Sequence, residues 1–322
     1  MGDNLNIERN NMFKRHKIIT LCFGLFIIFL VLFIILELTL KYVVGLGDPV
    51  LYRSYPLYGY RLLPDQELKR FHGSAINVNN LGLRADVDWD NNIENKILFL
   101  GDSVTYGGSY ISNDELFSSL AIKYVNGYVS GNGGNNGWGV SNIYGLIMDY
   151  KFLPAKIYVT VVPETDFYRG LTRLEGQPIW CKKPEFAFQE VFDYLLFKEG
   201  IKKYINWEST SSEDDIKRVV EQAVIKLRDM DSFLQSRGYK HLIYISPSRE
   251  QVLETNNKDE LVSDLVRTYN INVIYILDRI NSLNLNQEEK EKLFYDYIHL
   301  NKKGHELWAA VIGKDLSKLT GN

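Results

Sequence analysis

The sequence predicts a three-layer α/β domain, with helices on both faces of a doubly wound parallel sheet, preceded by a transmembrane helix. Two observations lead to this fold class. Short continuous apolar runs alternate with amphipathic helical patterns from residue 97 onward, and one long apolar run occupies residues 18–36. Continuous apolar runs are typical of strands buried on both faces of a parallel sheet, and their alternation with helices implies crossovers that cover both faces.

The individual elements of the domain follow from these patterns in order. Apolar runs predict strands at residues 97–100, 128–129, 157–162, 242–245 and 273–276. Apolar residues at helical spacing predict helices at residues 113–124, 142–150, 213–238, 260–269 and 302–316. Gly238 gives the third of these helices a stop signal at its C-terminus.

The long apolar run from Ile18 to Leu36 contains no charged residue. At a rise of about 1.5 Å per residue it nearly spans a hydrocarbon core of about 30 Å. It is longer than the apolar stretch of a signal peptide and lacks a small-residue cleavage site, so we interpret it as an uncleaved anchor. A buried core helix is the alternative, which we disfavour because such helices are rarely apolar on every side over this length.

Charge on the two sides of this run predicts its orientation. Basic residues lie directly before it, at Lys14, Arg15 and Lys17, whereas Lys41 and Arg53 are the comparable residues after it. This bias predicts a single-pass protein of the cell membrane with a cytoplasmic N-terminus and an extracytoplasmic domain.

The chain therefore divides into four predicted parts: a cytoplasmic tail over residues 1–17, a transmembrane anchor over 18–44, a loop-rich membrane-proximal segment over 45–96 and the α/β domain over 97–322. The membrane-proximal segment is rich in Gly, Pro, Tyr and Asn, with short alternations that predict short strands, such as residues 75–78. An insertion at about residues 167–212 interrupts the α/β alternation. It is rich in aromatic residues, namely Tyr168, Trp180, Phe186, Phe188, Phe192, Tyr194 and Trp207.

Composition excludes several classes of function. The formal net charge is -3 and the basic residues are scattered, so nothing indicates a nucleic-acid partner. The two cysteines, Cys22 and Cys181, are far apart and in different surroundings, which makes a disulfide implausible and leaves no Cys/His cluster for zinc. No phosphate-binding glycine loop is present either, so we expect neither a metal nor a cofactor.

The loops after the predicted strands carry the candidate chemistry, because the ligand site of a doubly wound sheet lies outside the carboxyl ends of its strands. These loops contain Ser103, Gly137 and Thr165, and Asp296 and His299 lie together near the C-terminus. A serine hydroxyl needs a base within hydrogen-bond reach, and that base needs a third group to orient it. We therefore predict Ser103 as nucleophile, with His299 as base and Asp296 as its partner, and an oxyanion hole formed by the N–H groups of Ser103 and Gly137.

These motifs together resemble the SGNH/GDSL hydrolase family in its membrane-anchored bacterial type. The resemblance covers about residues 76–318 and depends on Gly101-Asp102-Ser103 after an apolar strand and on Asp296-x-x-His299 near the C-terminus. It implies the flavodoxin-like SGNH fold. Residues 132–139 resemble the family's second block, whose glycine donates to the oxyanion hole, and residues 79–84 resemble a segment found before the serine block. A lone Gly-Asp-Ser or Asp-x-x-His is usually a turn or helix start, so the conjunction of motifs carries the assignment.

One block departs from the family pattern. The family's third block reads Gly-x-Asn-Asp, with an asparagine that completes the oxyanion hole, whereas residues 163–166 of this chain read Pro-Glu-Thr-Asp. Thr165 stands at the position of that asparagine and is the candidate third donor. An α/β-hydrolase fits less well than the SGNH family, because Thr105 occupies the last position of the Gly-x-Ser-x-Gly elbow.

The resemblance implies a serine-dependent ester hydrolase or O-acyl (acetyl) transferase that works through a Ser103 acyl-enzyme. With the predicted topology, the expected substrate is an extracytoplasmic acylated small molecule or polysaccharide. The expected partners are the lipid bilayer, through residues 18–44, and a membrane acyl-donor protein. The alternative is a catalytically weak or inactive membrane-bound glycan-binding or scaffolding subunit, which the missing asparagine keeps open.

Overall fold

Five parallel strands form the central sheet in the order β11-β10-β7-β5-β6. Their bounds are β5 Lys96–Gly101, β6 Val129–Asn132, β7 Ile157–Pro163, β10 Lys240–Ser246 and β11 Ile274–Tyr275. Numbered along the chain, this order reads 2-1-3-4-5, which is the flavodoxin-like doubly wound arrangement. The predicted fold class is thus confirmed, and the strand order reverses between β5 and β7.

The computed structural model describes residues 2–90, 92–149, 155–174, 180–198, 205–206, 213–254 and 258–321. The remaining parts of the predicted insertion, including Trp207, lie outside these residues. The described part of the insertion contains helix α5 (Ala187–Lys198) and a short antiparallel pair, β8 (Arg173–Leu174) with β9 (Ile205–Asn206).

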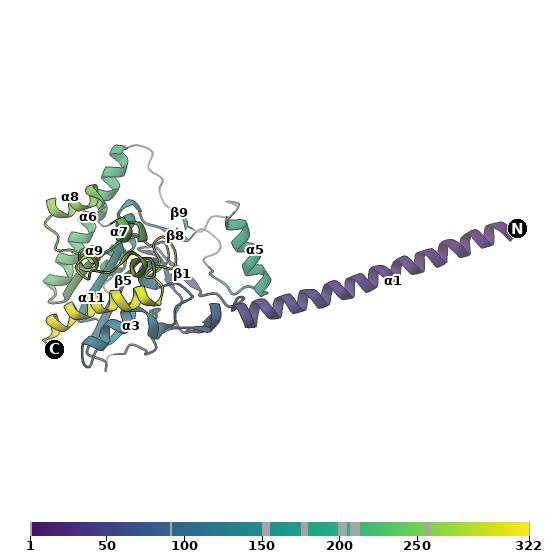
Figure 1. The fold of residues 1–322 in the computed structure, drawn as a ribbon, viewed down its shortest axis with the longest axis horizontal. Coiled ribbons are helices and arrows are strands. Elements are labelled where there is room, and N and C mark those ends of the chain that lie inside the picture. Colours follow the sequence, from purple (N-terminus) through teal and green to yellow (C-terminus); the bar gives the residue numbers. More distant parts are fainter. Residues whose placement is uncertain are drawn as a thin grey trace.

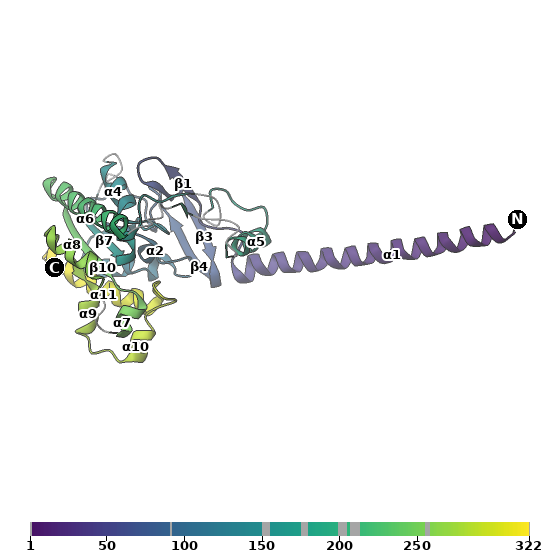
Figure 2. The same cartoon turned by 90° about the horizontal axis from the view of Figure 1, so that it is seen from above.

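Helices cover both faces of the sheet, as the alternating sequence pattern predicts (Figure 2). One face carries α3 (Phe117–Ala121), α9 (Ile276–Asn281) and α11 (Lys302–Thr320). The other carries α4 (Val140–Met148), α6 (Glu213–Ser236) and α8 (Glu260–Thr268). In β5, Ile97 and Phe99 pack with the first set and Leu98 and Leu100 with the second, so every residue of the apolar run is buried.

Helix α1 (Gly2–Thr39) continues through a π-helical turn at Leu40–Val44 and projects away from the domain (Figure 1). The segment His16–Val44 is long and apolar enough to cross a membrane. No part of its most apolar window is buried by the rest of the protein. Its side chains therefore have no core of their own to pack into, which is what a lipid-facing helix requires.

The membrane-proximal segment is more regular than its composition predicts. It forms two antiparallel hairpins, β1 (Tyr52–Tyr55) with β2 (Gly59–Leu62) and β3 (Gln66–Arg70) with β4 (Ser74–Val78). Side chains from these strands, including Tyr60, Leu62 and Ile76, are fully buried in the same core as the sheet. The core therefore extends upstream of residue 97.

The helix predicted at residues 113–124 is divided into three pieces. A 3-10 turn at Asn113–Glu115 and another at Ile122–Tyr124 flank the short α3. The break occurs because Leu116 adopts an extended conformation and Ser112 and Glu115 form a capping box around the first turn. The remaining short helices are α2 (Ser103–Tyr106), α7 (Arg249–Glu254) and α10 (Gln287–Glu291).

Candidate active site

Ser103 is the first residue of α2, directly after β5. The Asp102 side chain caps this helix by accepting the Val104 N–H at 2.8 Å. Gly101 permits the tight turn, since a Cβ there would lie 2.2 Å from the Val161 carbonyl oxygen of β7. The strand-to-helix turn therefore holds the Ser103 side chain at the carboxyl edge of the sheet, where the strand order reverses.

The structure brings the three predicted triad residues together. His299 Nε2 lies 2.9 Å from Ser103 Oγ, and His299 Nδ1 lies 2.7 Å from Asp296 Oδ2. With the proton on Nδ1, the ring donates to the carboxylate and accepts from the serine hydroxyl. This is the nucleophile, base and orienting-group geometry of acyl-transfer sites, although Ser103 and His299 lie 196 residues apart in the chain.

Asp296 is held as an anion by its own turn. Its Oδ1 accepts the backbone N–H groups of Ile298 at 2.9 Å and His299 at 2.8 Å. Burial alone would raise the pKa of Asp296, but these two bonds and the His299 ring outweigh burial and lower that pKa below its ordinary value. A carboxylate that stays ionised keeps the histidine oriented across the working pH range.

The predicted oxyanion donors lie on two neighbouring loops. Gly137 has φ +73° and occupies the third position of a turn closed by the Trp138 N–H to Asn135 carbonyl bond of 3.2 Å. Turns of this type favour glycine there. The Asn135 N–H donates to the Gly101 carbonyl at 3.2 Å, which fixes the turn beside the start of α2. Among the described residues, neither the Ser103 N–H nor the Gly137 N–H donates to another protein group, so both are available to a ligand.

Thr165 lies in the first turn of a 3-10 helix, Glu164–Tyr168, that follows β7. Its side chain is exposed and makes no hydrogen bond within the described part of the chain. It lines a polar pocket of about 370 Å³ together with Ile298, the neighbour of His299. Thr165 is thus at the correct edge of the sheet, and its role as oxyanion donor stays a prediction.

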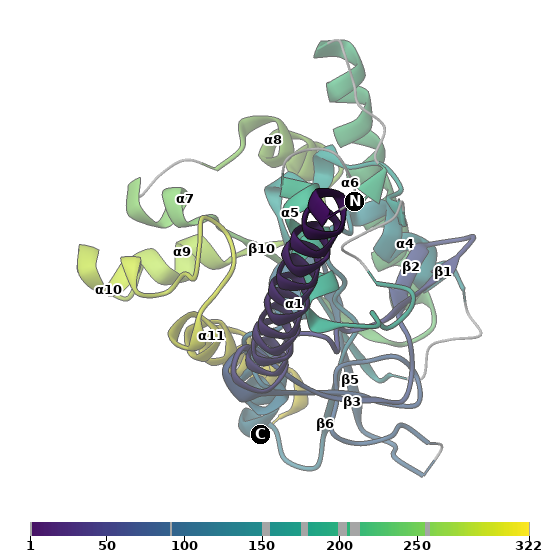
Figure 3. The ribbon, with the colours of Figure 1, turned by 90° about the vertical axis from the view of Figure 1, so that its right-hand side faces the viewer.

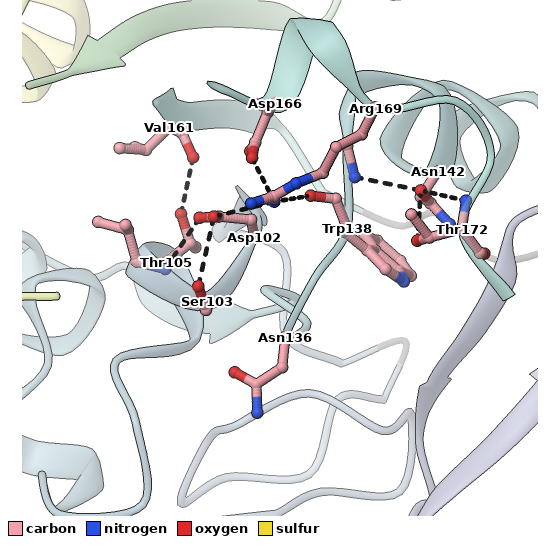
Figure 4. Close-up of polar contacts among 12 residues, drawn as sticks. Asp102, Ser103, Thr105, Asn136, Trp138, Asn142, Val161, Asp166, Arg169 and Thr172 are labelled. Atoms are coloured by element: carbon pink, nitrogen blue, oxygen red, sulfur yellow. Dashed lines mark hydrogen bonds and ion pairs between the residues drawn. The ribbon is translucent and has the colours of Figure 1, made fainter. Parts of the chain in front are cut away.

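A charged network behind Ser103 was not predicted from the sequence. Arg169 Nη1 donates to Asp166 Oδ1 at 2.7 Å and to the Trp138 carbonyl at 2.9 Å, and it lies 3.7 Å from Asp102 Oδ2 (Figure 4). Asp102 Oδ2 in turn lies 3.3 Å from Ser103 Oγ. The network therefore ties together the loops after β5, β6 and β7. No sequence signal indicates Arg169, because its partners come from three separate loops.

Two members of this network, Asp166 and Arg169, have pKa values that are shifted by their surroundings. Burial raises the pKa of Asp166 well above its ordinary value, and the nearby Asp102 carboxylate raises it further, whereas Arg169 lowers it. Burial would lower the pKa of Arg169, but Asp166 and Asp102 outweigh burial and raise it. The network therefore favours the protonated form of Asp166 and keeps Arg169 charged beside it.

Arg84 gives the segment at residues 79–84 a structural role. Its guanidinium is buried and donates to the carbonyl oxygens of Tyr106, Gly108 and Ile111 at 2.6–2.8 Å and to Asn113 Oδ1 at 3.0 Å. Its backbone pairs with Asn132 at the end of β6. One buried cation thus fixes the chain that leaves α2, and a lysine could not satisfy these acceptors in the same plane.

The described residues include no group of three or more His, Cys, Asp or Glu side chains arranged to hold a metal ion. His305, the other C-terminal histidine, is buried on α11 and its Nδ1 accepts the Phe117 N–H at 3.1 Å. Burial lowers the pKa of His305 to about 3, so it is a neutral core residue.

No protein-family model matches this sequence, and no curated protein sequence matches it. Solved structures that are similar in fold include members of the G-D-S-L family. A member of the lipolytic protein G-D-S-L family from Veillonella parvula is 13% identical, over 67% of this chain and 94% of that one, with a TM-score of 0.37. An acetyl xylan esterase is 16% identical, over 69% and 99%, with a TM-score of 0.43. A GDSL-like lipase from Bacteroides thetaiotaomicron is 12% identical, over 72% and 93%, with a TM-score of 0.39. These similarities concern the fold, and the roles of the residues depend on the site itself.

Proposed function

We propose that this protein is a serine-dependent ester hydrolase or O-acyltransferase with Ser103 as its nucleophile. The observation that carries the proposal is the hydrogen-bonded series from Asp296 Oδ2 through His299 to Ser103 Oγ, with contacts of 2.7 and 2.9 Å. A serine hydroxyl is a weak nucleophile until a base accepts its proton, and a histidine oriented by a carboxylate is the common solution.

The reaction proceeds in two halves. Ser103 Oγ attacks the ester carbonyl while His299 Nε2 accepts its proton, and the alcohol then leaves with that proton as the acyl group stays on Ser103. Water or a second hydroxyl next attacks the acyl-enzyme, with His299 again taking and returning the proton. Asp296 stabilises the imidazolium in both halves and is not itself protonated.

The N–H groups of Ser103 and Gly137 are the proposed donors to the oxyanion. Both are on loops whose positions are fixed by other bonds, so little reorganisation is needed when the charge develops. Thr165 is the proposed third donor. A donor of this kind is typically worth a factor of about 10²–10³ in kcat, so a weak third donor is consistent with a slow hydrolase.

We place the site outside the cytoplasm and propose that a carbohydrate near the membrane is its substrate, either as the ester that is cleaved or as the acceptor of the acyl group. The apolar segment His16–Val44 and the basic residues before it support this location. The pocket that Thr165 and Ile298 line supports a hydroxylated acceptor, because acid, amide, ammonium and phenol groups contribute to its wall. These come from Glu164, Gln251, Lys258, Asp259 and Tyr168. A bound and oriented sugar hydroxyl can compete with water, since positioning raises effective molarity by many orders of magnitude.

The second candidate is an inactive membrane-bound glycan-binding or scaffolding subunit. Thr165 at the position of the family's asparagine favours this reading. The hydrogen-bonded triad disfavours it, because a chain free of catalytic selection has no need to keep Ser103, His299 and Asp296 aligned.

The test uses the full chain in lipid nanodiscs with p-nitrophenyl acetate. Mass spectrometry of the quenched reaction should find an acetyl adduct on Ser103, and the Ser103→Ala protein is the matched control. Adding oligosaccharides while following free acetate and acetylated sugar separates hydrolysis from transfer. Free acetate at a rate indifferent to every saccharide would leave an esterase, and no turnover with either protein would favour the inactive subunit.

A further inference from the structure

Helix α5 packs against the C-terminal end of α1 (Figure 3). The ring of Phe33 in α1 lies 6.2 Å from that of Phe186 and 6.0 Å from that of Phe188, centroid to centroid. The Glu37 carboxylate accepts the N–H groups of Ala187 at 2.6 Å and Phe188 at 2.9 Å. A side chain of the apolar helix thus caps the first turn of α5 and fixes α5 against the C-terminal end of α1.

The outer face of α5 is apolar although it faces away from the domain. Phe188, Phe192 and Leu195 are 40%, 51% and 49% exposed, at the spacing of one helical face. An exposed helix face of a soluble domain is normally polar. Because Phe33 belongs to the apolar run that would cross the bilayer, this face lies at the level where that run meets lipid. The bilayer is therefore the partner that fits it.

The inner face of α5 is tied to the chain that leaves α1. Glu190 forms a buried ion pair with Arg70, and its Oε2 accepts the Gly47 N–H at 2.7 Å. Arg70 Nη1 also donates to the Gly45 carbonyl at 2.8 Å. These contacts fix α5, the exit of α1 and β3 as one unit.

A cavity of about 510 Å³ lies behind α5. Leu46, Phe71 and Val191 line the part next to the exit of α1 and the inner face of α5. Tyr106 and Asn136 also line the cavity. Tyr106 is on the same short helix as Ser103, and Asn136 directly precedes Gly137, the proposed oxyanion donor. The cavity therefore extends from the exit of α1 to α2 and the loop after β6, the two segments that carry Ser103 and Gly137.

We propose that this cavity takes the acyl chain of a bilayer lipid ester, which enters past α5 and presents its carbonyl to Ser103. The inference rests on the proposed ester chemistry and names its acyl donor. Ser103 Oγ forms a bond to the carbonyl carbon, the bond to the lipid's alcohol breaks, and that alcohol leaves with the proton from His299. The polar pocket beside Ile298 and Thr165 is left for the hydroxyl that accepts the acyl group.

The chain-length test compares p-nitrophenyl dodecanoate with p-nitrophenyl acetate on the full chain in nanodiscs. We expect kcat/KM to favour dodecanoate by at least about tenfold, since burial of methylene groups is favourable. Val191→Trp fills the cavity and should lower the ratio of the two kcat/KM values about tenfold. Leu283→Trp introduces the same side chain at an exposed position after α9, away from α5, and should leave the ratio unchanged. Val191→Phe, a smaller increase in volume, should move the ratio in the same direction as Val191→Trp.

Outcomes of this test separate the two proposals. Turnover of neither ester by the wild type would overturn the ester chemistry itself. Turnover that depends on Ser103 but shows no preference for dodecanoate, or a ratio indifferent to Val191→Trp and Val191→Phe, would overturn the acyl-chain site and leave the esterase. Turnover of acetate by each variant shows that the variant is assembled.

A second measurement tests the lipid source. In a chain with Cys22→Ser and Cys181→Ser, a bimane label on Phe192→Cys should be quenched by doxyl-labelled phosphatidylcholine in the nanodisc. The control is a label on Leu283→Cys, which is also exposed but follows α9 on the other side of the domain, and which should not be quenched. Equal quenching at the two positions would overturn entry from the bilayer.

Discussion

Asp296 contacts His299 at two points, because its Oδ1 accepts the backbone N–H of His299 at 2.8 Å while its Oδ2 lies 2.7 Å from the ring Nδ1. The same carboxylate thus fixes the backbone turn and the orientation of the ring. A substitution that keeps the contact with the backbone and loses the contact with the ring therefore separates the effect on folding from the effect on catalysis.

Asp296→Asn provides that separation. The amide oxygen can still accept the two backbone N–H groups, so the turn should persist, but the amide NH₂ facing Nδ1 favours the tautomer that cannot accept the Ser103 proton. We expect kcat for an aryl acetate to fall by about 10³–10⁴. The thermal midpoint should change little, and a variant with near wild-type kcat would remove Asp296 from the triad.

Ser103→Ala and His299→Ala should each abolish ester cleavage and leave the fold intact. The double variant should be little slower than either single one, because members of a triad act as a unit and their losses do not add. Steady-state rates with p-nitrophenyl acetate and circular dichroism check both statements. Wild-type turnover by Ser103→Ala would show that another group is the nucleophile.

Thr165→Asn should raise the rate of hydrolysis. An amide donor at this position can add one bond to the oxyanion, and such a bond is worth about 2.7–4 kcal/mol when it is fully formed. The gain should stay below that value because Thr165 is exposed and its loop is not built around an amide. Thr165→Val is the matched control. If asparagine leaves kcat unchanged while valine lowers it, the threonine hydroxyl already donates.

Asp166 gives a pH dependence of known sign. Its raised pKa means that the folded state binds this proton more tightly than the unfolded chain. The stabilisation is complete below the ordinary aspartate pKa of about 3.9 and is lost as pH rises toward the folded-state value. Asp166→Asn removes the titration, so the free energy of unfolding of the variant should gain on the wild type as pH rises from 4 to 8. Urea unfolding in detergent micelles measures the difference, and a difference independent of pH would mean that Asp166 is ionised throughout.

The predicted topology can be tested on the surface of the domain. In a chain with both native cysteines replaced by serine, Asn281→Cys should react with an impermeant maleimide in intact cells. Asn281 is exposed at the end of α9, and both native cysteines are exposed too, so their removal is necessary. Labelling only after lysis would place the domain in the cytoplasm.

The sequence predicts the sheet well where a strand can be identified from its own apolar residues. The runs in β5, β7 and β10 are buried on both faces, so their apolar character does not depend on any other part of the chain. The helix at residues 213–238 is similarly evident, because its apolar stripe alone buries it against the sheet.

Features that depend on distant partners are predicted only in part. The strand predicted at residues 75–78 is confirmed by β4, whereas the pairing of the membrane-proximal strands into hairpins and their burial in the common core are not predicted. The hairpins of the membrane-proximal segment are short and are stabilised by Tyr60 and Leu62 in the common core. Arg169 pairs with Asp166 in its own turn, but its other partners, Trp138 and Asp102, come from separate loops. The carbonyl acceptors of Arg84 lie 22 to 27 residues downstream, so no local pattern indicates them. The approach of His299 to Ser103 was predicted through the resemblance of two motifs, since no local rule relates residues so far apart in the chain.

The capping of α5 by Glu37 has a mechanical consequence. If α1 spans the bilayer, the connection between α1 and the domain is rigid, because Arg70 and Glu190 bind the backbone of Gly45 and Gly47. The fold then fixes the distance between the lipid surface and Ser103. Ser103 then works at one fixed distance from the lipid surface, so the proposed acyl acceptors are selected by how far their hydroxyl groups lie from the membrane as well as by their chemistry.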